Sequence, residues 1–549
     1  MSLHPQAPLS ASDETRRVAR AAFPRGTPCL RIADELGPIW RDEQFVTLFP
    51  RRGQPAEAPG RLALASVPQF VGNLSDRQAA DAVRGGIDRK YALGLSLTDP
   101  GFDHTVPGEF RSRLIGGNVG RLLLDTLLLV LRDRELIKAR GRQRTDSTHV
   151  LAAVRGLNRL ERVGETLRAA LNDLAVVAPE WLRALAPVEW HDRHDRRVEN
   201  HRLPKTGAAR LELAATVGAD GRRLLAAIDA AVGQPWLAQL PAVEVLRQVW
   251  EAQYIEEEGI LRWRTVAEMP AAAEQISSPY DPEARHGTRR EVSWVGYKVH
   301  FTETCDPDAP PLITNAETTP ATTPDDNMLA AVHQSLRESG LLPAGHLVDK
   351  GYTGAHALVD SKQRHGVTIV GPVADDPSWQ ARSGDGLAKA QFLVDWDHRV
   401  VTCPAGKQGI SWLPNTWPGN GVVFEARFSR KDCTPCSLRS RCTRAKNEPR
   451  IIGLQAREHH EALRDARRHQ ATEAFPQDHA ARAGVEATHA QAIGRCGLRR
   501  CRHAGLAKTT LRHVITAAAV NLVRIAEWFA GTPIAETRCS RFAALPSAA

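Results

Sequence analysis

Three acidic residues of the chain could together form one metal-binding catalytic site. Glu486 lies in Ala483-Gly-Val-Glu-Ala-Thr-His-Ala490 and precedes a run that is almost purely basic. Arg482 comes one helical turn before Glu486, so the two side chains are predicted to share a helix face. A single acid within a cationic field suits a site that holds a divalent metal ion and attracts a polyanion. The alternative is a helix with one ion pair and a solvated basic end.

Two other segments supply acids that fit a partner role for Glu486. Asp146 lies in the middle of Arg142-Gln-Arg-Thr-Asp-Ser-Thr-His-Val150, a short segment with the character of a strand. Asp349 ends the apolar run that begins at Gly345, just before Gly351. Other acids near strand–helix junctions are alternatives to Asp349, namely Asp281, Asp325 and Asp326.

Together these segments resemble the catalytic signature of DDE insertion-sequence transposases, over about residues 60–530. In that family the first Asp lies in a T/V-D-S/G-T strand, the second in a D-x-G-Y strand end, and the Glu on a late helix. An Arg precedes that Glu by four residues, and a G-L-R-R-x-R-x-x-G-L-x-K run follows, as in Gly497 to Lys508 here. Four positions depart from the family's usual residues and leave its contacts there in doubt: His479, Ala487, Ile493 and His503.

The resemblance implies DNA cleavage at the inverted-repeat ends of a bacterial insertion sequence and joining of the freed 3′-OH to target DNA. It implies two Mg²⁺ or Mn²⁺ ions, about 3.5–4 Å apart in such sites, with Asp146 bridging both and Asp349 and Glu486 completing one shell each. The partner would be double-stranded DNA, and pairing of two ends implies a homodimer in the active complex. The alternatives are an inactive DNA-binding derivative and a metal-dependent nuclease that does not join strands.

The charge of the chain also favours a polyanionic partner. The net charge is +9, and most of the positive charge is Arg, which binds phosphate oxygens bidentately. The alternative is that the Arg stripes are solvent-exposed helix faces that bind no partner. The residues predicted to contact DNA are Arg155, Arg159, Arg482, Arg495, Arg499, Arg500, Arg502 and Lys508.

A cysteine cluster predicts a second metal site. Cys433 and Cys436 are separated by two residues, Cys442 follows, and Cys403 begins a distant Cys-Pro-Ala-Gly knuckle. Four thiolates suit a tetrahedral, structural Zn²⁺, and the alternative is four reduced thiols without metal. The chain has nine Cys, an odd number, and no signal peptide is recognisable, so no disulfide framework is expected.

No apolar run approaches the roughly 20 residues that cross a membrane, so no membrane partner is expected, and the predicted location is cytoplasmic and nucleoid-associated. At 549 residues, the chain is predicted to form several domains of mixed α/β class. The resemblance implies a ribonuclease-H-like mixed sheet flanked by helices.

The expected divisions follow changes in composition and periodicity. The core would comprise residues 138–155, 275–371 and 479–532, with strands at 142–150, 292–301, 312–315, 345–349 and 366–371 and helices at 328–339 and 511–529. A helix would run on from about residue 151 into an all-α insertion. The remaining predicted units are a helical N-terminal domain (1–137, with 1–60 partly disordered), the helical insertion (156–274), a β-rich insertion that contains the four clustered cysteines (372–478) and a flexible tail (533–549).

Overall fold

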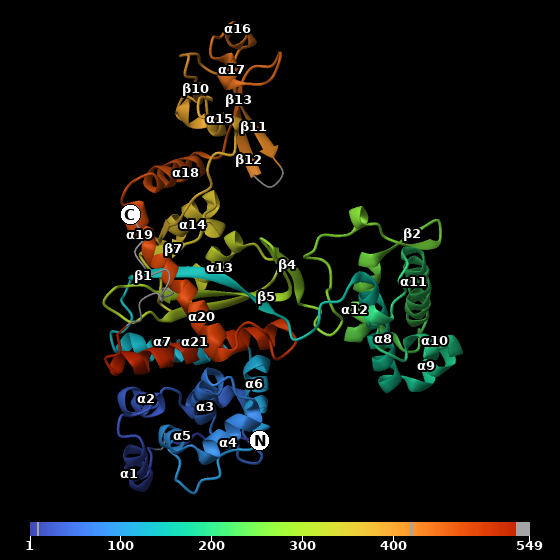
Figure 1. The fold of residues 1–549 in the computed structure, drawn as a ribbon, viewed down its shortest axis with the longest axis vertical. Coiled ribbons are helices and arrows are strands. Elements are labelled where there is room, and N and C mark those ends of the chain that lie inside the picture. The colour runs from blue at the N-terminus through green and yellow to red at the C-terminus, as the bar shows by residue number, and fades with distance from the viewer. Residues whose placement is uncertain (8–9, 418–420, 534–549) are drawn as a thin grey trace, which may run out of the picture.

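The computed structural model describes residues 1–7, 10–417 and 421–533, so the tail expected over 533–549 lies, but for its first residue, outside the described residues. A central sheet lies above a layer of N-terminal helices, and two inserted units project from it, one helical and one rich in strands (Figure 1). The predicted mixed α/β class is therefore confirmed.

Strand β1 (Arg142–Leu151) lies at the centre of a six-stranded mixed sheet. It pairs antiparallel with β5 (Val292–Thr304) and parallel with β7 (Gly345–Val348). β7 in turn pairs parallel with β8 (Thr368–Val370). These directions, with an antiparallel strand on one side of β1 and parallel strands on the other, are consistent with a ribonuclease-H-like core.

β5 carries two further strands on its outer edge, β6 (Ile313–Pro320) and β4 (Arg285–Arg289). β4 is not predictable from the sequence, because Arg-His-Gly-Thr-Arg lacks the apolar alternation of a half-buried strand. Gly296 lies where β5 meets both β1 and β4. Its φ is 153°, and a Cβ there would lie 2.2 Å from the Val150 carbonyl oxygen, so only glycine fits at this crossing.

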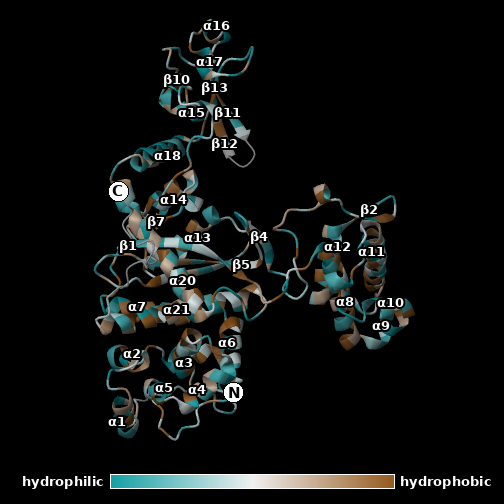
Figure 2. Ribbon diagram, viewed as in Figure 1, coloured by the Kyte–Doolittle hydropathy of each residue, from teal (hydrophilic) through white to brown (hydrophobic). Residues whose placement is uncertain are grey.

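Helix α21 (Leu506–Phe529) is the element on which both the sheet and the N-terminal helices pack. Its buried face belongs to one apolar core that also includes Leu62, Leu127 and Phe301. The apolar residues of α21 and of α7 (Leu122–Asp133) are visible in Figure 2. Asn521 fixes the helix to the sheet edge, since its side chain both donates to the Ile313 carbonyl (2.8 Å) and accepts from the Ile313 N–H (2.7 Å).

The N-terminal layer is entirely helical in its regular structure. Ser75 and Gln78 form the capping box that the sequence predicts, and Pro107 lies in the first turn of a helix, as expected. The elements before α7 are α1 (Asp13–Ala22), α2 (Pro28–Leu36), a 3-10 helix (Asp42–Leu48), α3 (Pro59–Val71), α4 (Asp76–Gly85), α5 (Ile87–Ala92) and α6 (Val106–Gly116).

The helical insertion follows β1 and has its own apolar core, built around Leu167, Leu224 and Leu246. Its elements are α8 (Arg159–Val177), α9 (Pro179–Leu185), α10 (Val188–His194), 3-10 turns at Asn200–Arg202, Pro235–Gln239 and Val266–Glu268, α11 (Gly207–Asp229), α12 (Pro241–Gln253), β2 (Tyr254–Glu257) and β3 (Ile260–Trp263).

Two expectations for this region were wrong. The helix predicted from about residue 151 begins only at Arg159, because β1 continues to Leu151 and Asn158 caps the helix in a capping box. The insertion also ends in the β2–β3 hairpin, whose turn residues Glu258 and Gly259 both have positive φ, which suits a tight hairpin turn.

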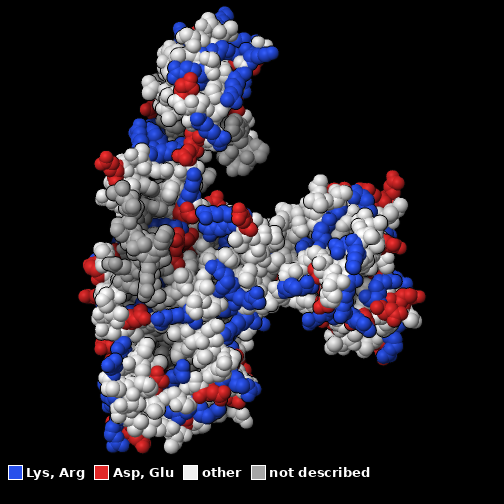
Figure 3. Space-filling view, in the orientation of Figure 1, with Lys and Arg blue, Asp and Glu red and all other residues white. Residues whose placement is uncertain are grey.

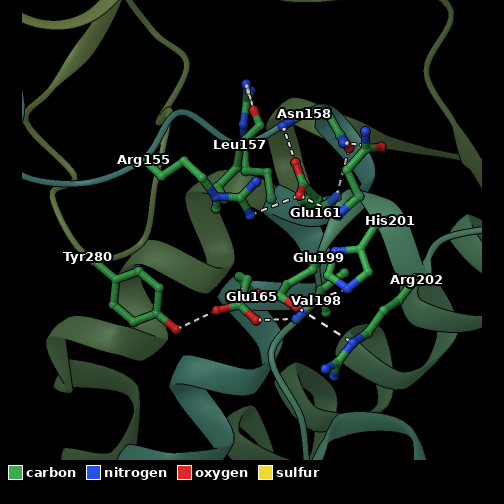
Figure 4. Close-up of polar contacts among 12 residues, drawn as sticks. Arg155, Leu157, Asn158, Glu161, Glu165, Val198, Glu199, His201, Arg202 and Tyr280 are labelled. Carbon is green, nitrogen blue, oxygen red and sulfur yellow. Dashed lines mark hydrogen bonds and ion pairs between the residues drawn. The ribbon is translucent and has the colours of Figure 1, made fainter.

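Two buried glutamates of α8 fasten this insertion to the segments around it (Figure 4). Glu161 accepts from the Asn200 N–H (2.7 Å) and pairs with Arg155 (2.8 Å). Glu165 accepts from the Val198 N–H (2.6 Å) and from the Tyr280 hydroxyl (2.6 Å). Because Tyr280 belongs to the segment that returns to the sheet, Glu165 ties the insertion to its own exit linker.

The second insertion joins a small antiparallel sheet to the helix that returns to the core. After β7 and β8 come its elements: α15 (Trp379–Arg382), a 3-10 turn (Lys389–Gln391), β9 (Leu393–Asp395), β10 (Val400–Thr402), β11 (Ser411–Trp417), β12 (Gly421–Arg427), α16 (Arg430–Cys433), α17 (Arg439–Cys442), β13 (Ile451–Leu454) and α18 (Arg457–Gln470).

The remaining elements flank the sheet: α13 (Met328–Glu338), α14 (Ala355–His365), 3-10 turns at Asp325–Asn327 and Lys350–Tyr352, α19 (Phe475–Ala480), a 3-10 turn (Ala481–Ala483) and α20 (Gly484–Cys496). Within the described ranges, no helix combines the length and the apolar character that crossing a bilayer would require.

Candidate active site

Asp146 occupies the central strand and is almost fully buried, with 6% of its surface exposed. Its Oδ1 accepts a hydrogen bond from the Ser147 N–H (2.8 Å). Burial raises the pKa of this carboxyl, and the nearby Arg482 guanidinium counteracts part of that effect. A buried carboxylate of this kind needs a cation beside it to remain ionised.

Asp349 follows β7 directly and lies next to Asp146 because of the sheet register. Thr145 is paired with Val348 in the parallel ladder. Asp146 follows Thr145 and Asp349 follows Val348, so the two acids are neighbours across the strands. Oδ1 of Asp349 accepts from the Lys350 N–H, which turns the chain into a short 3-10 helix. The parallel pairing thus brings two carboxyl groups together, one from within β1 and one from the residue that follows β7.

Glu486 reaches the same place from the first turn of α20, with 66% of its side chain exposed. Arg482 lies in the 3-10 turn just before this helix and connects all three acids. Its Nη2 is 2.7 Å from Asp146 Oδ2 and 3.7 Å from Asp349 Oδ2, while its Nη1 is 2.8 Å from Glu486 Oε1. The three acids predicted from the sequence therefore converge on one guanidinium group.

A buried ion cluster beneath the acids holds α20 in place. Glu303 of β5 is fully buried and lies 2.7 Å from both Arg144 and Arg524. The Thr488 hydroxyl of α20 donates to Glu303 (2.6 Å), and Arg144 also donates to the Ala481 carbonyl in the turn that carries Arg482. One carboxylate thus links the sheet, α20 and α21.

Two further basic side chains, which were not predicted from the sequence, lie at this site. Arg289 of β4 lies 3.7 Å from Asp349 Oδ2, and it donates to the Ser147 carbonyl (3.2 Å). Lys298 is 2.9 Å from Asp325. Arg289 could not be found from spacing, because β4 itself has no strand signal. Alternation along β5 could have shown Lys298 as a polar residue on the site face.

The competing acids have other partners. Asp325 accepts from the Ser147 hydroxyl (2.9 Å), and although burial opposes it, Lys298 lowers the pKa of Asp325 below its usual value. Asp281 is fully buried and accepts from the Tyr297 hydroxyl (2.6 Å) and the Gly505 N–H (3.2 Å), which fixes the start of α21. Asp325 therefore borders the site, whereas Asp281 has a structural role at the start of α21.

His479, at one of the positions that depart from the family pattern, lies at the end of β7. Its Nε2 is 3.0 Å from the Val348 carbonyl oxygen, and its ring stacks on Phe475 at 5.5 Å between centroids. The side chain therefore packs beside Asp349.

The residues predicted to contact DNA divide into two groups by their partners. Several are already engaged within the chain: Arg155 with Glu161, Arg159 with Gln253 and the Trp263 ring, Arg495 with Glu527, Arg499 with Thr148 and the His149 carbonyl, and Arg502 with the carbonyls of Asn73 and Leu74. Arg500 and Lys508 are exposed, and their side chains have no hydrogen bond or ion pair within the described part of the chain.

Lys508 and Arg502 line a cleft between α3, α6 and the loop that joins α20 to α21. Its volume is about 950 Å³, and Arg111, His503 and Arg512 also line it. Arg111 is held by Asp76 at 2.6 Å, and its buried Nη1 has no hydrogen-bond partner among the described residues. Most of the charged side chains that line the cleft are therefore basic, although Asp76 and Glu109 also line it.

The four cysteines of the predicted zinc site line one small cavity. Cys403, Cys433, Cys436 and Cys442 line a space of about 30 Å³, which is large enough for a single ion or water. Burial raises the pKa of Cys442, and the three other thiols act in the same direction. The fold thus gathers these four thiols from segments up to 39 positions apart.

Across residues 1–7, 10–417 and 421–533, no group of three or more His, Cys, Asp or Glu has the arrangement of a metal site. Arg482 instead bridges the three acids, because its guanidinium group contacts each of them. The donor set nevertheless fits a hard divalent ion, because three carboxylates from separate elements already surround one positive charge.

Two family models match parts of this chain. Residues 17–113 match the transposase domain DUF772, and residues 402–526 match the transposase DDE domain, a range that contains Glu486 and the four cysteines. No curated protein and no solved structure matches the chain. Both matched models are transposase domains, and together with the mixed α/β fold they indicate an insertion-sequence DDE transposase.

Proposed function

We propose that this transposase cuts DNA at the inverted-repeat ends of its element and joins the freed 3′-OH to target DNA, with Asp146, Asp349 and Glu486 holding two divalent ions. The observation that carries the proposal is the meeting of these acids, from β1, β7 and α20, around Arg482. Bound there, Mg²⁺ or Mn²⁺ would activate the attacking oxygen and stabilise the leaving 3′ oxygen.

The chain's own residues would prepare that chemistry. Asp146 is the most buried of the three acids, so it is the shared ligand in this proposal. Arg482 and Arg289 would neutralise the phosphate at the cut, because both guanidinium groups already border the acids. Burial of Asp146 excludes water from one side of the site.

The basic surfaces favour DNA as the partner. Figure 3 shows lysine and arginine side chains on the central body and on the helical insertion, on either side of a hollow between them. The cleft that Lys508 lines lies at the far end of α20 from Glu486, about 15–20 Å away at 1.5 Å per helical residue. A duplex that enters the site would cover both places, and two copies would be needed to hold two ends.

A labelled duplex with the inverted repeat of the element, a target plasmid and Mg²⁺ would test the proposal. We expect a nick at the repeat end and a product in which the labelled strand is joined to the plasmid. Cleavage without the joined product would identify a nuclease, and a shifted but intact duplex would identify an inactive DNA-binding derivative. Either result would contradict the proposal.

Lys508→Gln should weaken binding of the duplex about equally for all sequences. Because the exposed ammonium group would neutralise one phosphate, the slope of log affinity against log salt should fall by about 1. Filter binding at several salt concentrations measures both. Lys446→Gln, at an exposed lysine of the strand-rich insertion, is the matched control and should change neither quantity. An unchanged slope for Lys508→Gln would remove the cleft from the DNA path.

The four cysteines are proposed to hold one structural Zn²⁺, because they share one cavity of suitable size. The purified protein should contain about one zinc per chain, and Cys436→Ser should lower that content and the melting temperature. Elemental analysis and thermal unfolding provide these measurements. Cys305→Ser changes a thiol outside the cavity and should leave the zinc content unchanged, whereas zinc-free wild-type protein would show that these are simply reduced thiols.

A further inference from the structure

Arg482 makes the contacts that a metal ion would make at this site. One guanidinium group, with 14% of its side chain exposed, satisfies carboxylates from three elements at once. Its buried Nε has no hydrogen-bond partner among the described residues, so the group still has one unused donor. Few side chains can bind the same oxygen atoms as a divalent ion, and arginine does so with a single positive charge and a planar fork of donors.

We propose that Arg482 is an internal competitor of the metal, which keeps the three acids neutralised until DNA arrives. The guanidinium and the metal need the same carboxylate oxygens, so they cannot both hold Asp146 and Glu486. A DNA phosphate would draw Arg482 away, because arginine binds phosphate through paired, charge-assisted hydrogen bonds. Metal binding would then be coupled to DNA binding. This inference rests on the proposed function of the three acids.

The surrounding structure permits the side chain to change partners without moving the backbone. The turn that carries Arg482 is held by Arg144, which donates to the Ala481 carbonyl and is itself fixed by Glu303. A Cβ on Gly484 would meet the Arg144 guanidinium, so the start of the helix cannot shift toward it. Glu486 is the most exposed of the three acids, and the guanidinium can therefore swing outward on that side.

Coupling of this kind has a thermodynamic signature. If the closed arrangement excludes the metal, the apparent metal affinity is the intrinsic affinity multiplied by the fraction of molecules in which Arg482 is displaced. DNA that displaces Arg482 must then strengthen metal binding, and the metal must strengthen DNA binding by the same factor. Removing the guanidinium should abolish the competition and most of the coupling.

The test is a measurement of Mn²⁺ binding to the full chain. Either calorimetry or the electron spin resonance signal of free Mn²⁺ can measure this binding. Arg482→Gln should bind Mn²⁺ about tenfold more tightly than wild type when DNA is absent. Wild-type protein should gain Mn²⁺ affinity on adding the inverted-repeat duplex, and Arg482→Gln should gain much less. Arg482→Lys keeps the charge but lacks the planar fork, so without DNA its Mn²⁺ affinity should lie between those of wild type and Arg482→Gln.

Arg289→Gln is the matched control, because Arg289 lies beside Asp349 but does not touch Asp146 or Glu486. If it raises Mn²⁺ affinity as much as Arg482→Gln does, a general loss of positive charge explains the effect and the competition is refuted. Equal Mn²⁺ affinity in wild type and Arg482→Gln would refute it as well.

The double variant Asp146→Asn with Arg482→Gln separates this inference from the proposed function. It should lose the tight Mn²⁺ binding of Arg482→Gln. If Asp146→Asn has no effect on Mn²⁺ in either background, the acids are not metal ligands and the proposed function itself fails.

Discussion

Asp146→Asn should reduce strand cleavage by at least about a thousandfold and leave binding of the inverted-repeat duplex unchanged. A shared metal ligand contributes several kcal/mol of transition-state stabilisation, and each 1.4 kcal/mol corresponds to about a factor of ten in rate. The amide keeps the size of the side chain and still accepts a hydrogen bond from the Ser147 N–H, so the fold is expected to persist. Single-turnover cleavage and filter binding on the same preparation measure the two properties.

Asp326→Asn is the matched control for this prediction. Asp326 is exposed and lies beside Asp325, in the turn whose acids compete with Asp349 on sequence alone. The variant should cleave DNA at the wild-type rate. If Asp146→Asn retains wild-type cleavage, the three acids do not form the active site, whatever their contacts with Arg482.

Glu303→Gln should destabilise the catalytic core by about 3–5 kcal/mol, because it leaves two largely buried guanidinium groups without their counter-charge. The expected result is a large fall in melting temperature, which calorimetry measures. Glu461→Gln removes one partner of the exposed Arg457 pair and should cost about 0.5 kcal/mol or less. A Glu303→Gln protein as stable as wild type would show that the cluster positions α20 without stabilising it.

The difference in stability between wild type and Glu303→Gln depends on pH, because Glu303 is a titratable carboxylate. Burial would raise the pKa of Glu303, but Arg524 and Arg144 outweigh burial and hold it below the usual value. Its contribution is therefore complete above the unfolded pKa of about 4.3 and is lost as the pH falls toward the folded pKa. The gap in stability between wild type and Glu303→Gln should stay constant near neutral pH and narrow in acid.

The strands that carry the acids could be predicted from the sequence because their local patterns are strong. Arg142 to Val150 and Gly345 to Asp349 read as strands, and the structure has β1 and β7 there. The parallel pairing of these strands, which places Asp146 next to Asp349, depends on contacts across about 200 residues. No local pattern encodes it, so the convergence of the acids rested on the family resemblance.

The supporting side chains could not be predicted, since their roles are purely tertiary. Glu303 continues a strand of alternating residues, and only the structure brings Arg144 and Arg524 to it. Arg289 lies in a strand without an apolar pattern. Arg159, by contrast, was assigned to DNA on charge, and it lies over the Trp263 ring at 4.3 Å, a contact that sequence spacing gives no means to anticipate.

The single apolar core shared by α21, the sheet and the N-terminal helices limits how the protein can be dissected. A fragment that starts near Lys138 would expose the face of α21 that covers Leu62 and Leu127, and it should aggregate on expression. The N-terminal layer would in turn lose its main support. Footprinting or crystallisation trials should therefore use the intact polypeptide, with only the two projecting insertions as sites for truncation.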